Sequence, residues 1–138
     1  MSCILRVSGE SLNVDSLLSE FQLEADRSWK KGEPRTLKGK LYTDSGANFV
    51  ASGADLDEFN RQVNEATKYL EINAPVISEI VKFPGIQDAV LDFGVSLKEG
   101  YVTQFAYLPP KLIQLAASAG IGIEISHYAC GNDDGEDS

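Results

Sequence analysis

The chain has 138 residues, of which 43% are hydrophobic and 24% are charged, and its formal net charge at pH 7 is −9. This size and composition are typical of a globular domain that buries its own core without the help of a metal or a disulfide. The excess of acidic residues argues against non-specific binding to nucleic acid or to an anionic membrane, because both require clustered Lys and Arg.

The first residues, MSCILRVSGESL, carry neither the basic start nor the long apolar run of a signal peptide. No segment reaches the roughly 20 apolar residues that are needed to span a bilayer. The two cysteines of such a chain are expected to be thiols. We therefore expect a cytoplasmic protein with no nucleic-acid or membrane partner.

Apolar periodicity and turn residues predict ten elements along the chain. In chain order these are a strand at 2–9, a helix at 13–23, strands at 37–43 and 47–52, helices at 54–72 and 73–85, strands at 87–97 and 101–108, a helix at 109–120 and a strand at 121–128. The order β-α-β-β-α-α-β-β-α-β does not alternate strand with helix, so a doubly wound parallel sheet is not expected. The sequence predicts an α+β fold, with a mixed, mostly antiparallel sheet and helices packed on one face.

The break between the two middle helices is placed by local signals. Asn73 is a good helix cap, Pro75 suits a first turn, and Pro84 followed by Gly85 is a stop signal. The same kind of reasoning divides the chain into a single α+β domain at 1–130 and a disordered acidic tail at 131–138, which has acids and glycine but no apolar residue.

A basic segment, RSWKKGEPRTLKGK at 27–40, stands out in this acidic chain, with six cations and one acid. An exposed Trp29 beside Lys30, Lys31 and Arg35 would suit an acidic surface on a protein partner, since Trp and Arg are enriched at binding hot spots. The alternative is that Trp29 packs against the sheet and the lysines are solvated. These four residues are the candidate partner-binding site.

The only histidine, His127, alternates with Ile121, Ile123 and Ile125, which places it on the apolar face of the last strand. His127 and Tyr128 are therefore the second candidate site, a pocket that would bind a small molecule or carry out catalysis. The alternative is that His127 is a hydrogen-bonded residue at the end of a strand, without a functional role. One histidine and two distant cysteines do not have the spacing of a zinc site.

Other catalytic signals are absent from the sequence. Cys3 alternates with Leu5 and Val7, as a buried small hydrophobic residue does, and Cys130 has no partner that would activate it. Asp92, between Leu91 and Phe93, is expected on a solvated face of its strand. No phosphate-binding glycine motif and no nucleophile elbow is found. We predict no catalytic residue, no metal and no cofactor.

Four stretches in a fixed order, LRVSGESLNVDSLL, WKKGEP, LDFGV and LPPKLIQLAASAGIGIEISHY, resemble a bacterial family of uncharacterised small α+β domains, a domain of unknown function. The resemblance covers residues 2–128. It implies a small cytosolic bacterial protein without an assigned reaction, and some domains of this kind are suspected immunity proteins for toxins. It brings no catalytic residues.

Three hypotheses about function follow. The leading one is a non-enzymatic domain that binds another protein, with an immunity-type role as one form. The second is a small-molecule-binding protein or an enzyme with a pocket near His127. The third is a structural homodimer that forms through the edges of the sheet.

Overall fold

The computed structural model describes residues 2–129, and the expected tail at 131–138 lies outside the described residues. Eight elements follow one another along the chain: β1 (Cys3–Gly9), α1 (Val14–Phe21), β2 (Arg27–Trp29), β3 (Ser45–Ser52), α2 (Phe59–Val81), β4 (Asp88–Leu97), α3 (Pro110–Ala119) and β5 (Gly122–Ala129). None of the helices in this described part is both long and apolar enough to cross a membrane.

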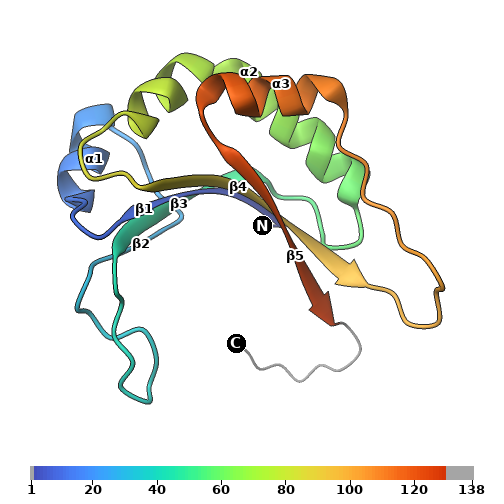
Figure 1. Ribbon diagram of the computed structural model, residues 1–138, viewed down its shortest axis with the longest axis horizontal. Coiled ribbons are helices and arrows are strands. Elements are labelled where there is room, and N and C mark those ends of the chain that lie inside the picture. The colour runs from blue at the N-terminus through green and yellow to red at the C-terminus, as the bar shows by residue number, and fades with distance from the viewer. Residues whose placement is uncertain (1, 130–138) are drawn as a thin grey trace.

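The five strands form one sheet in the order β2-β3-β1-β4-β5. Three neighbouring pairs are antiparallel, and β4 with β5 is parallel. The three helices cover one face of this sheet, and the other face carries no helix (Figure 1). The predicted α+β class, with a mixed, mostly antiparallel sheet and helices on one side, is confirmed.

Alternation along the central strands explains the two faces. Cys3, Leu5 and Val7 of β1 are completely buried, and they lie opposite Phe93, Leu91 and Ala89 of β4. These side chains meet the apolar stripe of α2, which includes Val63, Ala66, Leu70 and Ile77. Burial of such side chains is the main stabilising contribution, about 1.5–3 kcal/mol for each large one.

The expected helices at 54–72 and 73–85 are one continuous helix, α2, with Pro75 inside it. Leu70, Ile77 and Ile80 are all buried, so one helical face continues across the proline. Asn73 does not cap a helix; its side-chain amide donates to the carbonyl of Tyr69 at 2.9 Å. Continuous packing thus outweighs the cost of about 3 kcal/mol that an internal proline imposes.

The strand expected at 37–43 is wrong, and its place beside β3 is taken by β2, which pairs Arg27 with Asn48. Residues 37–43 contain only an isolated bridge from Leu41 to Pro34. Gly39 has a φ of +88°, within a turn in which the amides of Gly39 and Lys38 donate to Thr36. This turn reverses the chain within the segment that was expected to be extended.

The strand expected at 101–108 is also wrong. Its intended partner β4 has both edges occupied, one by β1 and the other by β5, so a hairpin with 101–108 has no free edge. The segment instead connects β4 to α3, and its aromatic side chains are exposed: Tyr101 at 67%, Phe105 at 86% and Tyr107 at 69%. The alternation of apolar residues in this segment does not reflect a strand.

Candidate functional site

The face of the sheet without helices, which we call the open face, is polar. Strand register aligns Arg27 of β2, Asn48 of β3 and Arg6 of β1 in one row across it. The next row contains Ile4, Asp92 and Glu124. Because opposite residues of paired strands share a face, charged groups from four strands meet here.

Trp29 forms one wall at the edge of the open face. Its indole lies against Gly46, where a Cβ would come within 2.4 Å of Trp29 Cζ2. It stacks on Tyr42 with ring centroids 5.7 Å apart, and its Nε1 donates to Asp44 at 3.0 Å. Trp29 is only 9% exposed, as in the alternative in which it packs against the sheet. The side chain is a fixed part of the wall.

Residues 30–44, which we call the arm, extend from β2 and β3 on the side away from the helices (Figure 1). The arm has its own backbone ladder: the amide of Gly32 donates to Tyr42, that of Tyr42 to Glu33, and that of Arg35 to Lys40, at 2.7–2.9 Å. At its base the Lys31 amide donates to Ser45 Oγ at 2.9 Å. These bonds give the arm a defined shape.

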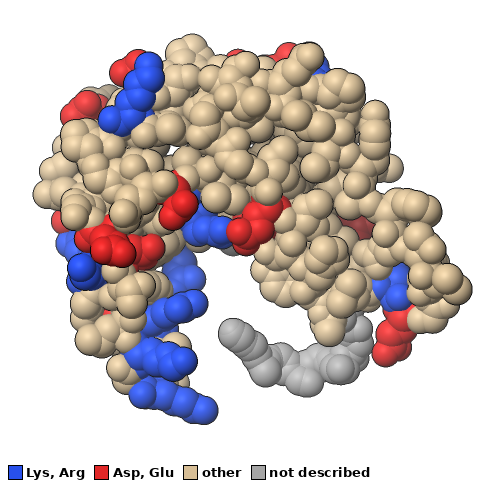
Figure 2. Space-filling view, in the orientation of Figure 1, with Lys and Arg blue, Asp and Glu red and all other residues tan. Residues whose placement is uncertain are grey.

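The arm carries five of the chain's twelve basic residues. Figure 2 shows Lys and Arg side chains along it, beside a hollow that opens between the arm and the end of β5. Within the described residues, no acidic side chain forms an ion pair with Arg27, Arg35, Lys38 or Lys40. By contrast, Arg6 is ion-paired at the centre of the sheet.

Arg6 is the centre of a network on the open face. Its guanidinium donates to Asp92 Oδ2 at 3.0 Å and to Glu124 Oε2 at 3.3 Å, and Ser126 Oγ donates to Asp92 Oδ1 at 2.7 Å. Partial burial disfavours the charged form of Arg6, but these acidic partners outweigh it and raise the pKa of Arg6 above its usual value. Arg6 is thereby held in place, with its charge compensated.

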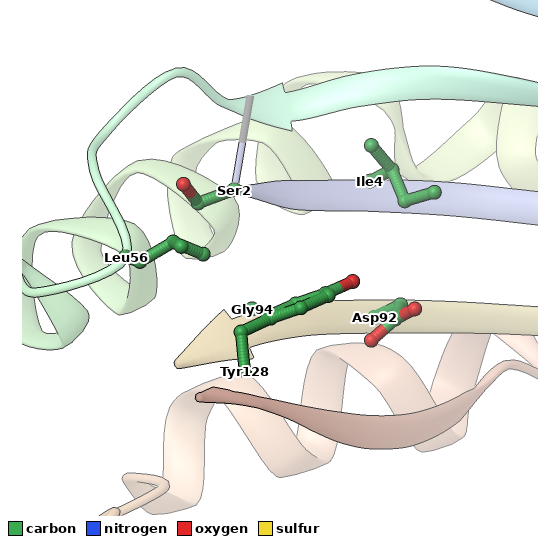
Figure 3. A pocket seen from close by; sticks show the side chains of 6 residues that line it. All are labelled: Ser2, Ile4, Leu56, Asp92, Gly94 and Tyr128. Carbon is green, nitrogen blue, oxygen red and sulfur yellow. The ribbon is translucent and has the colours of Figure 1, made fainter. Parts of the chain in front are cut away.

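The hollow on the open face has a volume of about 640 Å³, and we call it the arginine hollow. Its walls come from β1, β2, β3, the arm and β5, and they include Arg6, Arg27, Trp29, Arg35, Tyr42 and Tyr128. A smaller hollow of about 190 Å³, the side pocket, shares Tyr128 with it. Figure 3 shows the residues that line the side pocket. Fixed aromatic walls and arginine side chains are suited to holding an anionic group.

The structure divides the four predicted partner-binding residues. Trp29 and Arg35 line the arginine hollow. Lys30 and Lys31 line a different hollow of about 280 Å³ beside the start of α1, where Lys30 Nζ lies 2.7 Å from Asp15 Oδ2. The hydrogen bond and the charge of Asp15 raise the pKa of the exposed Lys30. Because Lys30 and Lys31 lie outside the arginine hollow, Arg27 and Arg35 are the candidate binding residues within it.

The structure also separates His127 from Tyr128. His127 is in register with Val95, on the side of the helices, and it is exposed. Tyr128 is in register with Ser96 and contributes to both hollows on the open face. Adjacent residues of a strand point to opposite faces, so these two side chains do not form one pocket.

Cys3, on the covered face, is unsuited to nucleophilic chemistry. Burial, together with the negative charge of Asp92, raises the pKa of this thiol well above its usual value. Cys130 lies outside the described residues. Within residues 2–129 no three His, Cys, Asp or Glu side chains gather as a metal ion would require.

Sequence reasoning missed Arg6, Tyr42, Asn48 and Glu124 as members of one site, and it took Asp92 for an ordinary solvated residue. Asp92 is on the opposite face from Leu91 and Phe93, as predicted, but its side chain is only 12% exposed and is bonded to Arg6. One signal was available: an arginine between the apolar residues Leu5 and Val7 within a strand. The pairing of β1 with β4 and of β4 with β5 was not readable from one sequence.

The chain matches the model of the family described as Domain of unknown function (DUF4279) over residues 1–130. The chain therefore belongs to this family, and the predicted resemblance to a family of uncharacterised domains is confirmed. Searches of curated proteins and of solved structures found no match.

Proposed function

We propose that this member of the DUF4279 family is a non-enzymatic binding domain that recognises an acidic segment of a partner protein in the arginine hollow. The observation that carries the proposal is the pair Arg27 and Arg35. Both line the hollow, both are exposed, and neither forms an ion pair with an acid of the described residues. Exposed guanidinium groups are the usual partners of carboxylates in protein interfaces.

A protein segment fits the charge better than a nucleic acid does. The chain as a whole has a charge of −9, so a long polyanion would be repelled by most of its surface. A short acidic segment needs only the local excess of cations that the arm supplies. The hollow also contains acceptors for backbone amides, the carboxylates of Asp44 and Glu124, which a peptide can use and a phosphate backbone cannot.

The residues on which an enzyme hypothesis would depend do not converge in this hollow. Cys3 faces the helices, and His127 is on the other side of β5 from Tyr128. A fixed wall of Trp29 stacked on Tyr42, with Arg27 5.9 Å from the centre of the indole ring, favours recognition instead. An immunity-type protein that covers an acidic loop of a toxin is one form of this proposal. Cytoplasmic location and bacterial origin stay predictions.

The test uses two fluorescent peptides of equal length, one of glutamates and one of lysines, and measures binding to the protein by fluorescence anisotropy at low and high salt. We expect the glutamate peptide to bind, more weakly at high salt, because screening reduces exposed charge interactions. The double variant Arg27→Gln, Arg35→Gln should bind it about tenfold or more weakly, as expected for the loss of charge-assisted hydrogen bonds.

The matched control is Lys68→Gln, Lys82→Gln, which removes the same charge from exposed positions in and just after α2, in the helical layer. It should bind the glutamate peptide like the wild type. Equal binding of both peptides, or unchanged affinity in the arginine variant, would contradict the proposal. Tighter binding of single-stranded DNA than of the glutamate peptide would point to a nucleic-acid partner instead.

A further inference from the structure

The side pocket on the open face has no part in the charge recognition described above. It lies between β1 and β4 on one side and Tyr128 on the other, with Leu56 from the segment before α2 closing one end (Figure 3). Tyr128 extends across Gly94 toward Asp92 and also lines the arginine hollow. The two hollows are therefore neighbours that share one aromatic wall.

The pocket is preformed, because hydrogen bonds fix its surroundings. The amide of Gly94 donates to the carbonyl of Ser2 at 2.6 Å, and the carbonyl of Gly94 accepts from the buried side chain of Gln62 at 2.8 Å. The amide of Ser96 donates to the carbonyl of Leu56 at 3.1 Å. A ligand that enters would find these backbone positions already in place, which reduces the entropic cost of binding.

Gly94 determines how closely the walls approach. A Cβ at this position would lie 2.8 Å from Leu56 Cδ2 and 3.3 Å from Tyr128 Cε2. With glycine there, both side chains lie directly over the strand. Together with Ile4 they give the pocket walls that are largely hydrocarbon.

The chemistry of the pocket selects an apolar group. Among the described residues Asp92 is the only charged one that lines it, and its two carboxylate oxygens are already engaged, one by Arg6 and the other by Ser126. A cation would compete with Arg6 for that carboxylate, whereas an aliphatic group needs no polar partner. The volume, about 190 Å³, is below the roughly 300–1,000 Å³ that is usual for pockets of whole small molecules. It is suited to one side chain.

We propose that the side pocket receives a single aliphatic side chain, such as leucine, of the same partner segment whose acidic residues lie in the arginine hollow. This inference rests on the proposed function and specifies its ligand: an acidic segment with one aliphatic anchor. The shared wall, Tyr128, lets one extended chain reach both hollows. A buried apolar anchor beside a charged surface is the usual arrangement of a binding hot spot.

The test compares two fluorescent glutamate peptides that are identical except for one central residue, leucine in one and serine in the other. On the wild type we expect the leucine peptide to bind about tenfold more tightly, as expected for the burial of one aliphatic side chain. The variant Ile4→Phe fills the pocket and should abolish this ratio while leaving the serine peptide bound as before. The control Val50→Phe, which lies opposite Ile4 on β3 and outside the pocket lining, should keep the ratio.

The outcomes separate the two proposals. Equal affinity of the wild type for both peptides overturns the anchor and leaves the acidic recognition standing. Failure of both peptides to bind overturns the proposed function and the anchor with it. If Ile4→Phe does not fold, the methyl signals of Ile4 and Leu56 in the NMR spectrum of the wild type decide: we expect them to shift with the leucine peptide and not with the serine peptide, and equal shifts would contradict the anchor.

Discussion

The two faces of the sheet are built from the same strands and have different roles. On β1, Cys3, Leu5 and Val7 contact the helices and are completely buried, whereas Ile4 and Arg6 on the other side remain half-buried. The covered face excludes water and supplies most of the stability. The open face carries ion pairs, two hollows, and two arginines, Arg27 and Arg35, that form no ion pair with an acid of residues 2–129. A sheet with helices on one side only can therefore devote its other side to binding.

The strongest test of this comparison is a pair of adjacent substitutions in β1. Leu5→Ala, on the covered face, should lower the free energy of unfolding by about 2–5 kcal/mol, because it leaves a cavity in a closely packed core. Ile4→Ala, on the open face, should cost about 1 kcal/mol, because its side chain is partly exposed and already borders a hollow. Urea denaturation measures both. Equal losses would show that the open face contributes as much to stability as the core does.

A substitution in the wall of the arginine hollow is expected to change the free energy of unfolding by a smaller amount. In Gly46→Ala the new Cβ would lie 2.4 Å from Trp29 Cζ2 and 2.6 Å from the carbonyl oxygen of Val7, so the indole must move. We expect a loss of about 1–3 kcal/mol, typical of overpacking. Since Trp29 is the only tryptophan, a red shift of the fluorescence emission reports its displacement.

The control for this variant is Gly53→Ala, at a glycine whose Cβ would meet nothing within 4 Å. It should change neither the emission nor the unfolding midpoint by a comparable amount. An unshifted emission spectrum in Gly46→Ala would mean that Trp29 does not depend on the missing Cβ for its position.

Much of the covered face was predictable from the sequence, because local alternation and helical spacing report directly on burial. The strands at Cys3–Gly9 and Asp88–Leu97 and the apolar stripe that includes Leu70 follow from such patterns. The predicted strand at 101–108 failed because the pattern cannot show that β5 already occupies the edge of β4. The predicted break between two helices near Pro75 was wrong for a related reason. Local helix signals carry no information about how the residues on both sides of the proline pack.

The open face was predictable only in part. Trp29 and Arg35 were selected because a tryptophan among cations is conspicuous in an acidic chain, and both line the arginine hollow. Arg6 is 86 residues from Asp92 and 118 residues from Glu124 along the chain. The pairing of β1 with β4 and of β4 with β5 brings these three side chains together. Residues that come from separate strands show no fixed spacing in the sequence that would mark them as one site. Such a site can be recognised only when the register of the sheet is known.

The smallest predicted effect concerns a connection between the two faces. Cys3 belongs to the covered face, and its pKa is raised first by burial and then by the charge of Asp92 on the open face. A thiol in the unfolded chain loses its proton near pH 8.5, whereas the folded protein retains it to higher pH. The unfolded state then binds fewer protons than the folded state, so the contribution of Cys3 to stability is complete below about pH 8.5 and declines above it.

The measurement compares the wild type with Cys3→Ala by urea denaturation from pH 7 to pH 10, under reducing conditions. Between about pH 8.5 and pH 10 the wild type should lose roughly 1–2 kcal/mol more than the variant, because one proton changes stability by about 1.4 kcal/mol per pH unit. Burial, and after it the charge of Cys3, also raises the pKa of Tyr69, but both proteins contain this tyrosine, so its own effect near pH 10 is common to the two curves. Parallel curves for the two proteins would contradict the prediction, since they would show that the Cys3 thiol ionises as readily in the fold as in the unfolded chain.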